Sequence, residues 1–158
     1  VARLHADVVA EGLARGVEAT WLVGISLGGL AAMLYAERHA QVAGIVALAP
    51  YVGTRDTLAE VRAAGGLANW RADASRGLDW ERRLLAWLQG FARGEPRPPM
   101  WLCYGRDDRF ADSLDMLAAD LPRVGRIVRD GGHAWDTWTR LWDELLAGAV
   151  GARIGARA

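Results

Sequence analysis

The sequence predicts an α/β domain with a mostly parallel open sheet and helices on both faces. Short apolar runs alternate with stretches of helical periodicity, and turn residues separate them. One run, 42–49, is apolar throughout. Strands that alternate with helices form parallel sheets, and a strand without polar positions fits a sheet that is covered on both faces.

The composition is that of one folded domain. Of the 158 residues, 52% are hydrophobic and 24% are charged, which supplies enough apolar material for a core. The 19 basic residues, all of them Arg, balance 19 acidic residues to a formal net charge of zero. Because no dense basic run is present, we do not expect nucleic acid as a partner.

The expected elements follow one another as helix, strand, helix, strand, helical excursion, strand, helix, strand and helix. The first helix carries apolar residues at helical spacing and ends at Gly16. Pro50 stops the second strand, and Pro122 stops the helix before the last strand. The expected ranges are 2–15, 20–23, 27–39, 42–49, 53–96, 100–104, 112–121, 124–129 and 134–150. We treat 1–150 as a single domain and expect the tail, 151–158, to be frayed.

The strongest local signal is the sequence GISLG at 24–28, which matches G-x-S-x-G between a predicted strand and a predicted helix. So tight a turn needs neighbours without side chains, and it holds Ser26 in a strained conformation above the sheet. The backbone N–H of Leu27, at the start of the next helix, can donate to an oxyanion. The alternative is a glycine-rich turn with an ordinary serine.

Candidate base and acid residues follow the later strands. His133 lies between a predicted strand and a predicted helix, whereas His5 and His39 are expected to be surface or packing residues. A neutral histidine needs an acceptor, and either Asp107 or Asp108, after the third strand, can serve. Because all these segments follow parallel strands, we expect them to meet at one edge of the sheet, in the chain order Ser, Asp, His.

Together these motifs resemble the α/β-hydrolases of the serine esterase type, over residues 1–150. In that family the acid stands in Gly-x-x-Asp, and the sequence GRDD at 105–108 fits with Asp108 as the acid. The stretch GGHAWDTW at 131–138 is similar to the Gly-Gly-His-x-Trp-x-x-Trp stretch of many esterases. The resemblance implies that Ser26 attacks a carbonyl carbon, His133 transfers the proton and Asp108 orients His133.

The chain departs from the family pattern before Ser26. The family has several strands before the nucleophile strand, and a loop after one of them supplies a second oxyanion donor. Here only one helix is predicted there, so we expect a C-terminal part of a hydrolase whose nucleophile strand lies at an exposed edge. The candidate functions are an esterase, a thioesterase, acyltransferase or peptidase with the same triad, or a weakly active or inactive binding module that self-associates through this edge.

The resemblance also places residues 53–96 where the family often inserts a lid. One amphipathic helix stands out there, over 79–91. Together with Ile25, three tryptophans of this segment are candidates for an acyl or aromatic pocket; they are Trp70, Trp80 and Trp87. The alternative is that they pack on the sheet, which we favour for at least two of them.

The remaining expectations concern ligands and location. We expect a small-molecule acyl substrate, and neither a cofactor nor a metal, because the sequence lacks the motifs of nucleotide and metal sites. The longest uncharged stretch, 19–36, is near the lower limit for a membrane span, but glycines and a serine interrupt it, so we expect no membrane span. The one cysteine, Cys103, lies in a predicted strand and is expected to be buried and inert. A chain with one cysteine forms no intrachain disulfide, which fits a reducing, cytoplasmic compartment.

Overall fold

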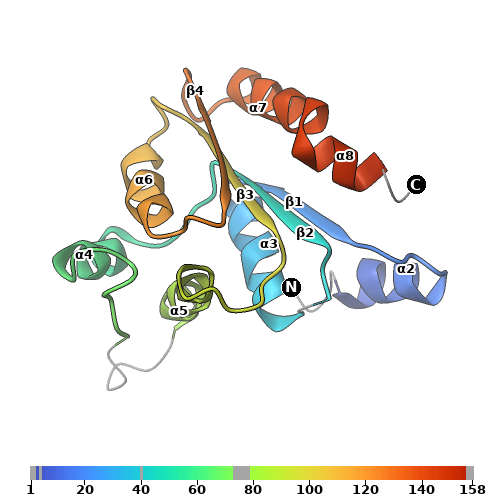
Figure 1. The fold of residues 1–158 in the computed structure, drawn as a ribbon, viewed down its shortest axis with the longest axis horizontal. Helices are drawn as coiled ribbons and strands as arrows, with labels where there is room; N and C mark the ends of the chain where they lie inside the picture. The colour runs from blue at the N-terminus through green and yellow to red at the C-terminus, as the bar shows by residue number, and fades with distance from the viewer. Residues whose placement is uncertain (1–2, 4, 40, 73–78, 156–158) are drawn as a thin grey trace.

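The computed structural model describes residues 3, 5–39, 41–72 and 79–155 (Figure 1). Its centre is a four-stranded sheet in which each strand pairs in parallel with the next along the chain. The strands are β1 (Trp21–Ile25), β2 (Gly44–Leu48), β3 (Met100–Gly105) and β4 (Gly125–Arg129). The predicted α/β class with a parallel sheet is therefore confirmed. The order β1-β2-β3-β4 leaves β1 at one edge of this sheet.

Helices cover both faces of the sheet (Figure 1). On one face lie the helices that connect successive strands: α3 (Leu27–Arg38), α4 (Arg55–Ala63), α5 (Trp80–Ala92) and α6 (Ala111–Ala119). On the other face lie α7 (Trp135–Ala147) and α8 (Ala149–Gly155), which follow β4. Before β1, a π-helical turn (η1, His5–Val9) leads into α2 (Ala10–Ala14).

Alternating residues of β2 belong to two separate apolar cores, one on each face of the sheet. Ile45 and Ala47 belong to the core that contains α3, α5 and α6 residues. Val46 and Leu48 belong to a second core with α7 residues. All five β2 residues are buried, as expected of a strand covered on both faces.

The structure differs from the sequence-based elements at three places. The expected single helix over 2–15 is a π-helical turn followed by the short α2. The expected helix over 134–150 breaks at Gly148, and the chain continues as α8 to Gly155, where a frayed tail was expected; residues 156–158 of that tail lie outside the described residues. The reason is packing, because Val150 is fully buried and Ile154 is partly buried against the second core. The excursion contains a second helix, α4, which the sequence analysis did not single out.

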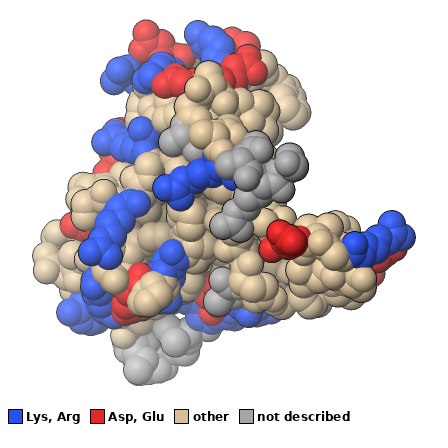
Figure 2. Space-filling model, turned by 45° about the vertical axis from the view of Figure 1, so that its right-hand side comes forward, with Lys and Arg blue, Asp and Glu red and all other residues tan. Residues whose placement is uncertain are grey.

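The distribution of surface charge and the lengths of the helices bear on nucleic acid and on a membrane as partners. Acidic and basic side chains are interspersed on the face that Figure 2 shows. Among the residues that the structure describes, no helix has the length and apolar character needed to cross a bilayer.

Candidate active site

Ser26 lies in the turn between β1 and α3 with φ 53° and ψ −116°. A positive φ is strained for a residue with a side chain and persists only where the surroundings hold it. Two backbone hydrogen bonds hold it here. The Ser26 N–H donates to the Leu48 carbonyl at 2.9 Å, and the Tyr51 N–H donates to the Ser26 carbonyl at 3.1 Å. The serine is thus fixed to the carboxyl end of the neighbouring strand.

Two glycines make this turn possible by their lack of a side chain. A Cβ at Gly24 would lie 2.2 Å from the Gly28 carbonyl oxygen, and a Cβ at Gly29 would lie 2.8 Å from the Pro50 Cβ. At Gly28 a Cβ would meet nothing within 4 Å. The expected need for neighbours without side chains therefore holds at Gly24 and Gly29. At position 28 a side chain would meet no neighbouring atom, so steric crowding does not require a glycine there.

Three of the predicted site residues come together at the carboxyl edge of the sheet. His133 Nε2 lies 3.0 Å from Ser26 Oγ, and His133 Nδ1 lies 2.8 Å from Asp108 Oδ2. The Asp108 side chain has no exposed surface, and the His133 side chain is 15% exposed. Both distances are within hydrogen-bond reach, which a base must satisfy toward the proton that it removes.

Of the two neighbouring carboxylates, Asp108 is the one that reaches the histidine. Its second oxygen, Oδ1, accepts a hydrogen bond from the Phe110 N–H at 2.9 Å, so both oxygens have a fixed partner. The Asp107 carboxylate is exposed and accepts from the Gly131 N–H at 3.3 Å. Asp107 thus braces the histidine loop without touching the imidazole.

The loops after β3 and β4 are tied to each other, which positions the acid relative to the histidine. The Asp107 N–H donates to the Gly131 carbonyl at 3.0 Å. Gly105 lets the loops approach, because a Cβ there would lie 1.9 Å from that same carbonyl oxygen. The His133 ring is then flanked by the edge-on rings of Phe110 and Trp138, at 5.2 Å and 5.0 Å.

Leu27 is the first residue of α3. The first backbone N–H groups of a helix have no acceptor within the helix, and they carry the positive end of its dipole. The Leu27 N–H therefore lies directly after Ser26 at the start of α3, where it has no acceptor within the helix.

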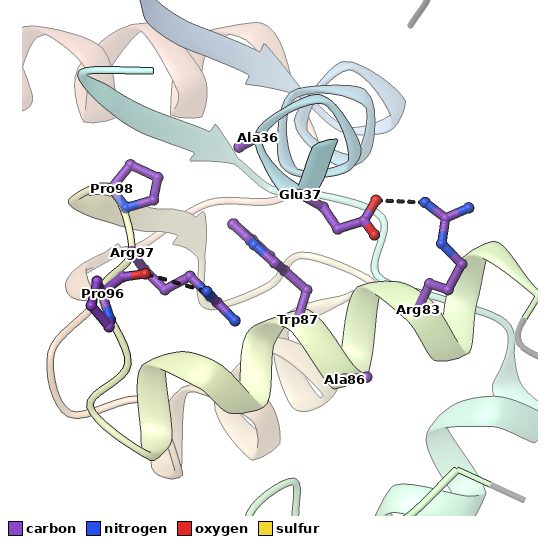
Figure 3. Close-up of a pocket in the computed structure, with 8 residues that line it drawn as sticks. All are labelled: Ala36, Glu37, Arg83, Ala86, Trp87, Pro96, Arg97 and Pro98. Carbon is purple, nitrogen blue, oxygen red and sulfur yellow. Dashed lines mark hydrogen bonds and ion pairs between the residues drawn. The ribbon is translucent and has the colours of Figure 1, made fainter. Parts of the chain in front are cut away.

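The tryptophans that were predicted to line a pocket lie in different parts of the structure. Trp70 is 2% exposed and packs in the larger core. Trp87 lines a cavity of about 630 Å³ together with Ala36, Glu37 and Arg97 (Figure 3). Ala36 is ten residues beyond Ser26, roughly 15 Å along α3 at the rise of a helix. The structure therefore does not bring Trp70 or Trp87 to Ser26, and they fit the packing alternative.

The other two candidates lie nearer to the site. Ile25 is partly buried and lines a small apolar cavity of about 260 Å³ between β1 and α7, together with Trp135 and Trp138. Trp80, the first residue of α5, is 39% exposed and contacts Tyr51, with ring centroids 6.1 Å apart.

Two residues beside the site were missed by the sequence analysis. Tyr51 directly follows the turn after β2, and its backbone is bonded to Ser26. Phe110 lies two residues after Asp108 and contacts both Tyr51, at 5.7 Å, and His133. The rule that led to Ser26, Asp108 and His133, namely residues just after parallel strands, also applies to both.

Residues expected to be inert lie away from Ser26 or deep in the core. His5 stacks on His39 at 4.2 Å and hydrogen bonds to the Tyr35 hydroxyl at 2.8 Å. Cys103 is fully buried, and this burial raises the pKa of its thiol to about 12. Within the described part of the chain, no three His, Cys, Asp or Glu side chains form a group that could hold a metal ion.

No family model and no curated protein matches the chain. Solved structures do resemble it. A ferulic acid esterase is similar with a TM-score of 0.57 and 15% sequence identity, and the match covers 91% of this chain and 58% of the esterase chain. A fluorophosphonate-binding serine hydrolase of Staphylococcus aureus has a TM-score of 0.61 and 14% identity, over 90% and 60%. A carboxylesterase of Nitrososphaera gargenis has a TM-score of 0.60 and 16% identity, over 97% and 72%. The chain spans less than two thirds of the length of the first two. These likenesses show that the chain has the α/β-hydrolase fold.

Proposed function

We propose that the protein is a serine hydrolase that cleaves carboxylic esters through an acyl-enzyme. The observation that carries the proposal is the unbroken hydrogen-bonded series from Ser26 Oγ through His133 to Asp108. The strained turn at Ser26 and the buried, fully hydrogen-bonded Asp108 carboxylate add to it, because strained backbone and buried charged groups cluster at functional sites. The esterase and hydrolase names of the similar structures agree with this chemistry.

In the proposed reaction, His133 Nε2 accepts the proton of Ser26 Oγ as the oxygen bonds to the carbonyl carbon. The Leu27 N–H stabilises the oxyanion, and Asp108 stabilises the imidazolium. His133 then gives its proton to the leaving alkoxide, and the ester C–O bond breaks. Water, deprotonated by His133, attacks the acyl group, and the acid leaves as Ser26 regains its proton.

Turnover of p-nitrophenyl acetate by the wild-type chain, the Ser26→Ala variant and the His133→Ala variant tests the proposal. We expect hydrolysis by the wild type and its loss in both variants. Unchanged hydrolysis by Ser26→Ala would overturn the proposal. A matched panel of ester, thioester and amide substrates decides among the acyl-transfer reactions that this triad supports.

A second candidate function, a binding module, is favoured by the edge of the sheet at β1, where no described residue pairs with the outer side of the strand. β1 pairs on one side with β2, and apolar side chains beside it are exposed: Val23 is 47%, Leu27 is 66% and Trp135 is 71% exposed. Such an edge pairs readily with another strand. This candidate predicts association without turnover, so a monomer on a sizing column that hydrolyses ester would exclude it.

A further inference from the structure

A row of aromatic rings leads outward from the candidate base. Phe110 meets His133 edge-on at 5.2 Å, Tyr51 meets Phe110 at 5.7 Å, and Trp80 meets Tyr51 at 6.1 Å. The three rings come from three separate segments: the loop after β3, the loop after β2 and the start of α5. Their meeting is therefore a product of the tertiary fold.

Two of these rings are fixed to the triad through their own backbone. The Phe110 N–H donates to Asp108 Oδ1 at 2.9 Å, and the Tyr51 N–H donates to the Ser26 carbonyl at 3.1 Å. The hydrogen bonds that hold the acid and the nucleophile thus also set where these rings lie.

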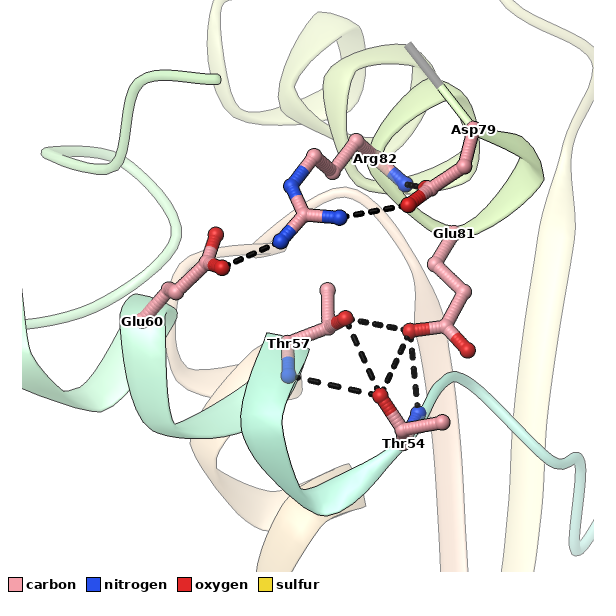
Figure 4. Close-up of polar contacts among 6 residues, drawn as sticks. All are labelled: Thr54, Thr57, Glu60, Asp79, Glu81 and Arg82. Carbon is pink, nitrogen blue, oxygen red and sulfur yellow. Dashed lines mark hydrogen bonds and ion pairs between the residues drawn. The ribbon is translucent and has the colours of Figure 1, made fainter. Parts of the chain in front are cut away.

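A buried carboxylate fixes the third ring. Glu81, the neighbour of Trp80, is 6% exposed. Figure 4 shows its carboxylate directed toward Thr54 and Thr57. It accepts hydrogen bonds from the Thr54 N–H at 3.2 Å, the Thr54 hydroxyl at 2.8 Å and the Thr57 hydroxyl. Thr54 is three residues after Tyr51, so this carboxylate joins the start of α5 to the loop that carries Tyr51.

The row is placed where a substrate can reach it. Phe110 and Tyr51 are half-buried and Trp80 is 39% exposed, whereas Trp70, in the core, is 2% exposed. The Tyr51 hydroxyl makes no hydrogen bond to any residue that the structure describes. Burial, and then the charge of Glu81, raise the pKa of Tyr51, so its hydroxyl remains a neutral donor.

We propose that Phe110, Tyr51 and Trp80 form an aryl-binding wall, which holds an aromatic ring on the alcohol side of the ester. The inference rests on the proposed function. The side follows from the chemistry, since the leaving oxygen must lie within hydrogen-bond reach of His133 Nε2 to receive its proton. The substituent on that oxygen then lies beside the two rings that flank His133, Phe110 and Trp138, and Phe110 is the one from which the row of rings continues. Aromatic rings prefer offset or edge-to-face partners, and this wall offers ring edges and faces.

The test compares benzyl acetate with cyclohexylmethyl acetate, which differ only in the aromaticity of the ring. Their kcat/KM ratio is normalised by the ratio of their hydroxide-catalysed rates. We expect the benzyl ester to be favoured by about 2- to 10-fold, the range that aromatic pairing supplies. A second pair, methyl 3-phenylpropanoate and methyl 3-cyclohexylpropanoate, carries the ring on the acyl side and should show a smaller preference.

Two variants assign the preference to the wall. Phe110→Leu and Trp80→Leu should bring the benzyl ratio close to one, and the ratio corrects for any common loss of turnover. Trp80 contacts Tyr51, not His133, so its substitution leaves the imidazole contacts in place. Trp101→Leu is the matched control, because Trp101 lies near the start of β3, whereas the candidate site follows the end of that strand. It should keep the wild-type ratio of benzyl to cyclohexylmethyl acetate turnover.

The outcomes separate this inference from the proposed function. Equal normalised turnover of the two acetates, a preference confined to the acyl-side pair, or a ratio unchanged in both wall variants would overturn the aryl-binding wall while leaving ester hydrolysis intact. Absence of turnover on all four esters would overturn the proposed function, and the inference with it.

Discussion

Replacing Asp108 by Asn changes the hydrogen bonding at His133 while keeping the shape of the side chain. In the native site both carboxylate oxygens are occupied, Oδ2 by His133 Nδ1 at 2.8 Å and Oδ1 by the Phe110 N–H at 2.9 Å. The side chain has no exposed surface, so water cannot replace either partner. The orientation of the new amide is therefore decided by these two contacts.

The Phe110 N–H requires an acceptor, so the amide oxygen of Asn at position 108 must face it. The reverse orientation sets two donors against each other and leaves a buried N–H unpaired, at a cost of about 1–3 kcal/mol. The amide NH₂ then donates to His133 Nδ1, which forces the imidazole proton onto Nε2. That nitrogen now presents a proton to Ser26 Oγ and cannot accept one.

We expect kcat to fall about 10⁴-fold, the loss that this substitution causes in a well-studied Ser-His-Asp triad. The assay is p-nitrophenyl acetate turnover, with thermal unfolding measured on the same samples to show that the fold is kept. Asp107→Asn is the matched control, because that carboxylate is exposed and does not touch His133. If Asp108→Asn keeps its turnover while Asp107→Asn loses it, the assignment of the acid is refuted.

Three further predictions concern the fold around the site. Gly24→Ala should destabilise the protein by at least about 1–3 kcal/mol in urea unfolding, because the new Cβ would lie 2.2 Å from a backbone oxygen; Gly28→Ala, which meets open space, should not, and an equal loss in both would contradict this account. Burial raises the pKa of the Cys103 thiol to about 12, so iodoacetamide at mildly alkaline pH should modify it only after unfolding; rapid modification of the native protein would disprove its burial. Asp79→Ala should cost about 1 kcal/mol, because the carboxylate caps α5 by accepting the Arg82 N–H at 2.9 Å. That hydrogen bond lowers the pKa of Asp79, so its contribution is present above the unfolded-state value and lost as the pH falls through the lower folded-state value; a difference between variant and wild type that persists in acid would contradict it.

The sheet and the meeting of the three triad residues could be predicted from the sequence because both depend on local patterns. Apolar runs define the strands, and parallel strands bring whatever follows them to one edge. Their place after β3 left both Asp107 and Asp108 open as the acid, and only the resemblance to the family's Gly-x-x-Asp pattern favoured Asp108. The structure separates them through the contacts of their side chains, of which Asp108 has the one to His133.

The surroundings of the site could not be predicted in the same way. Trp70, Trp80 and Trp87 all lie in the excursion, yet one is in the core, one contacts Tyr51 and one lines a distant cavity. The difference arises from tertiary contacts such as the Glu81 carboxylate, which joins α5 to the loop before α4. A hydrogen bond between residues so far apart in the chain leaves no periodic pattern in the sequence from which it could be predicted.

Labelling with a fluorophosphonate shows whether His133 activates Ser26. Such probes react with serines that a neighbouring base activates. The probe is added to the folded chain and to the Ser26→Ala and His133→Ala variants, followed by intact mass and peptide mapping. We expect one adduct, on Ser26, that is absent from both variants. A folded wild-type chain that takes up no probe, or an adduct that persists in His133→Ala at the wild-type rate, would contradict it.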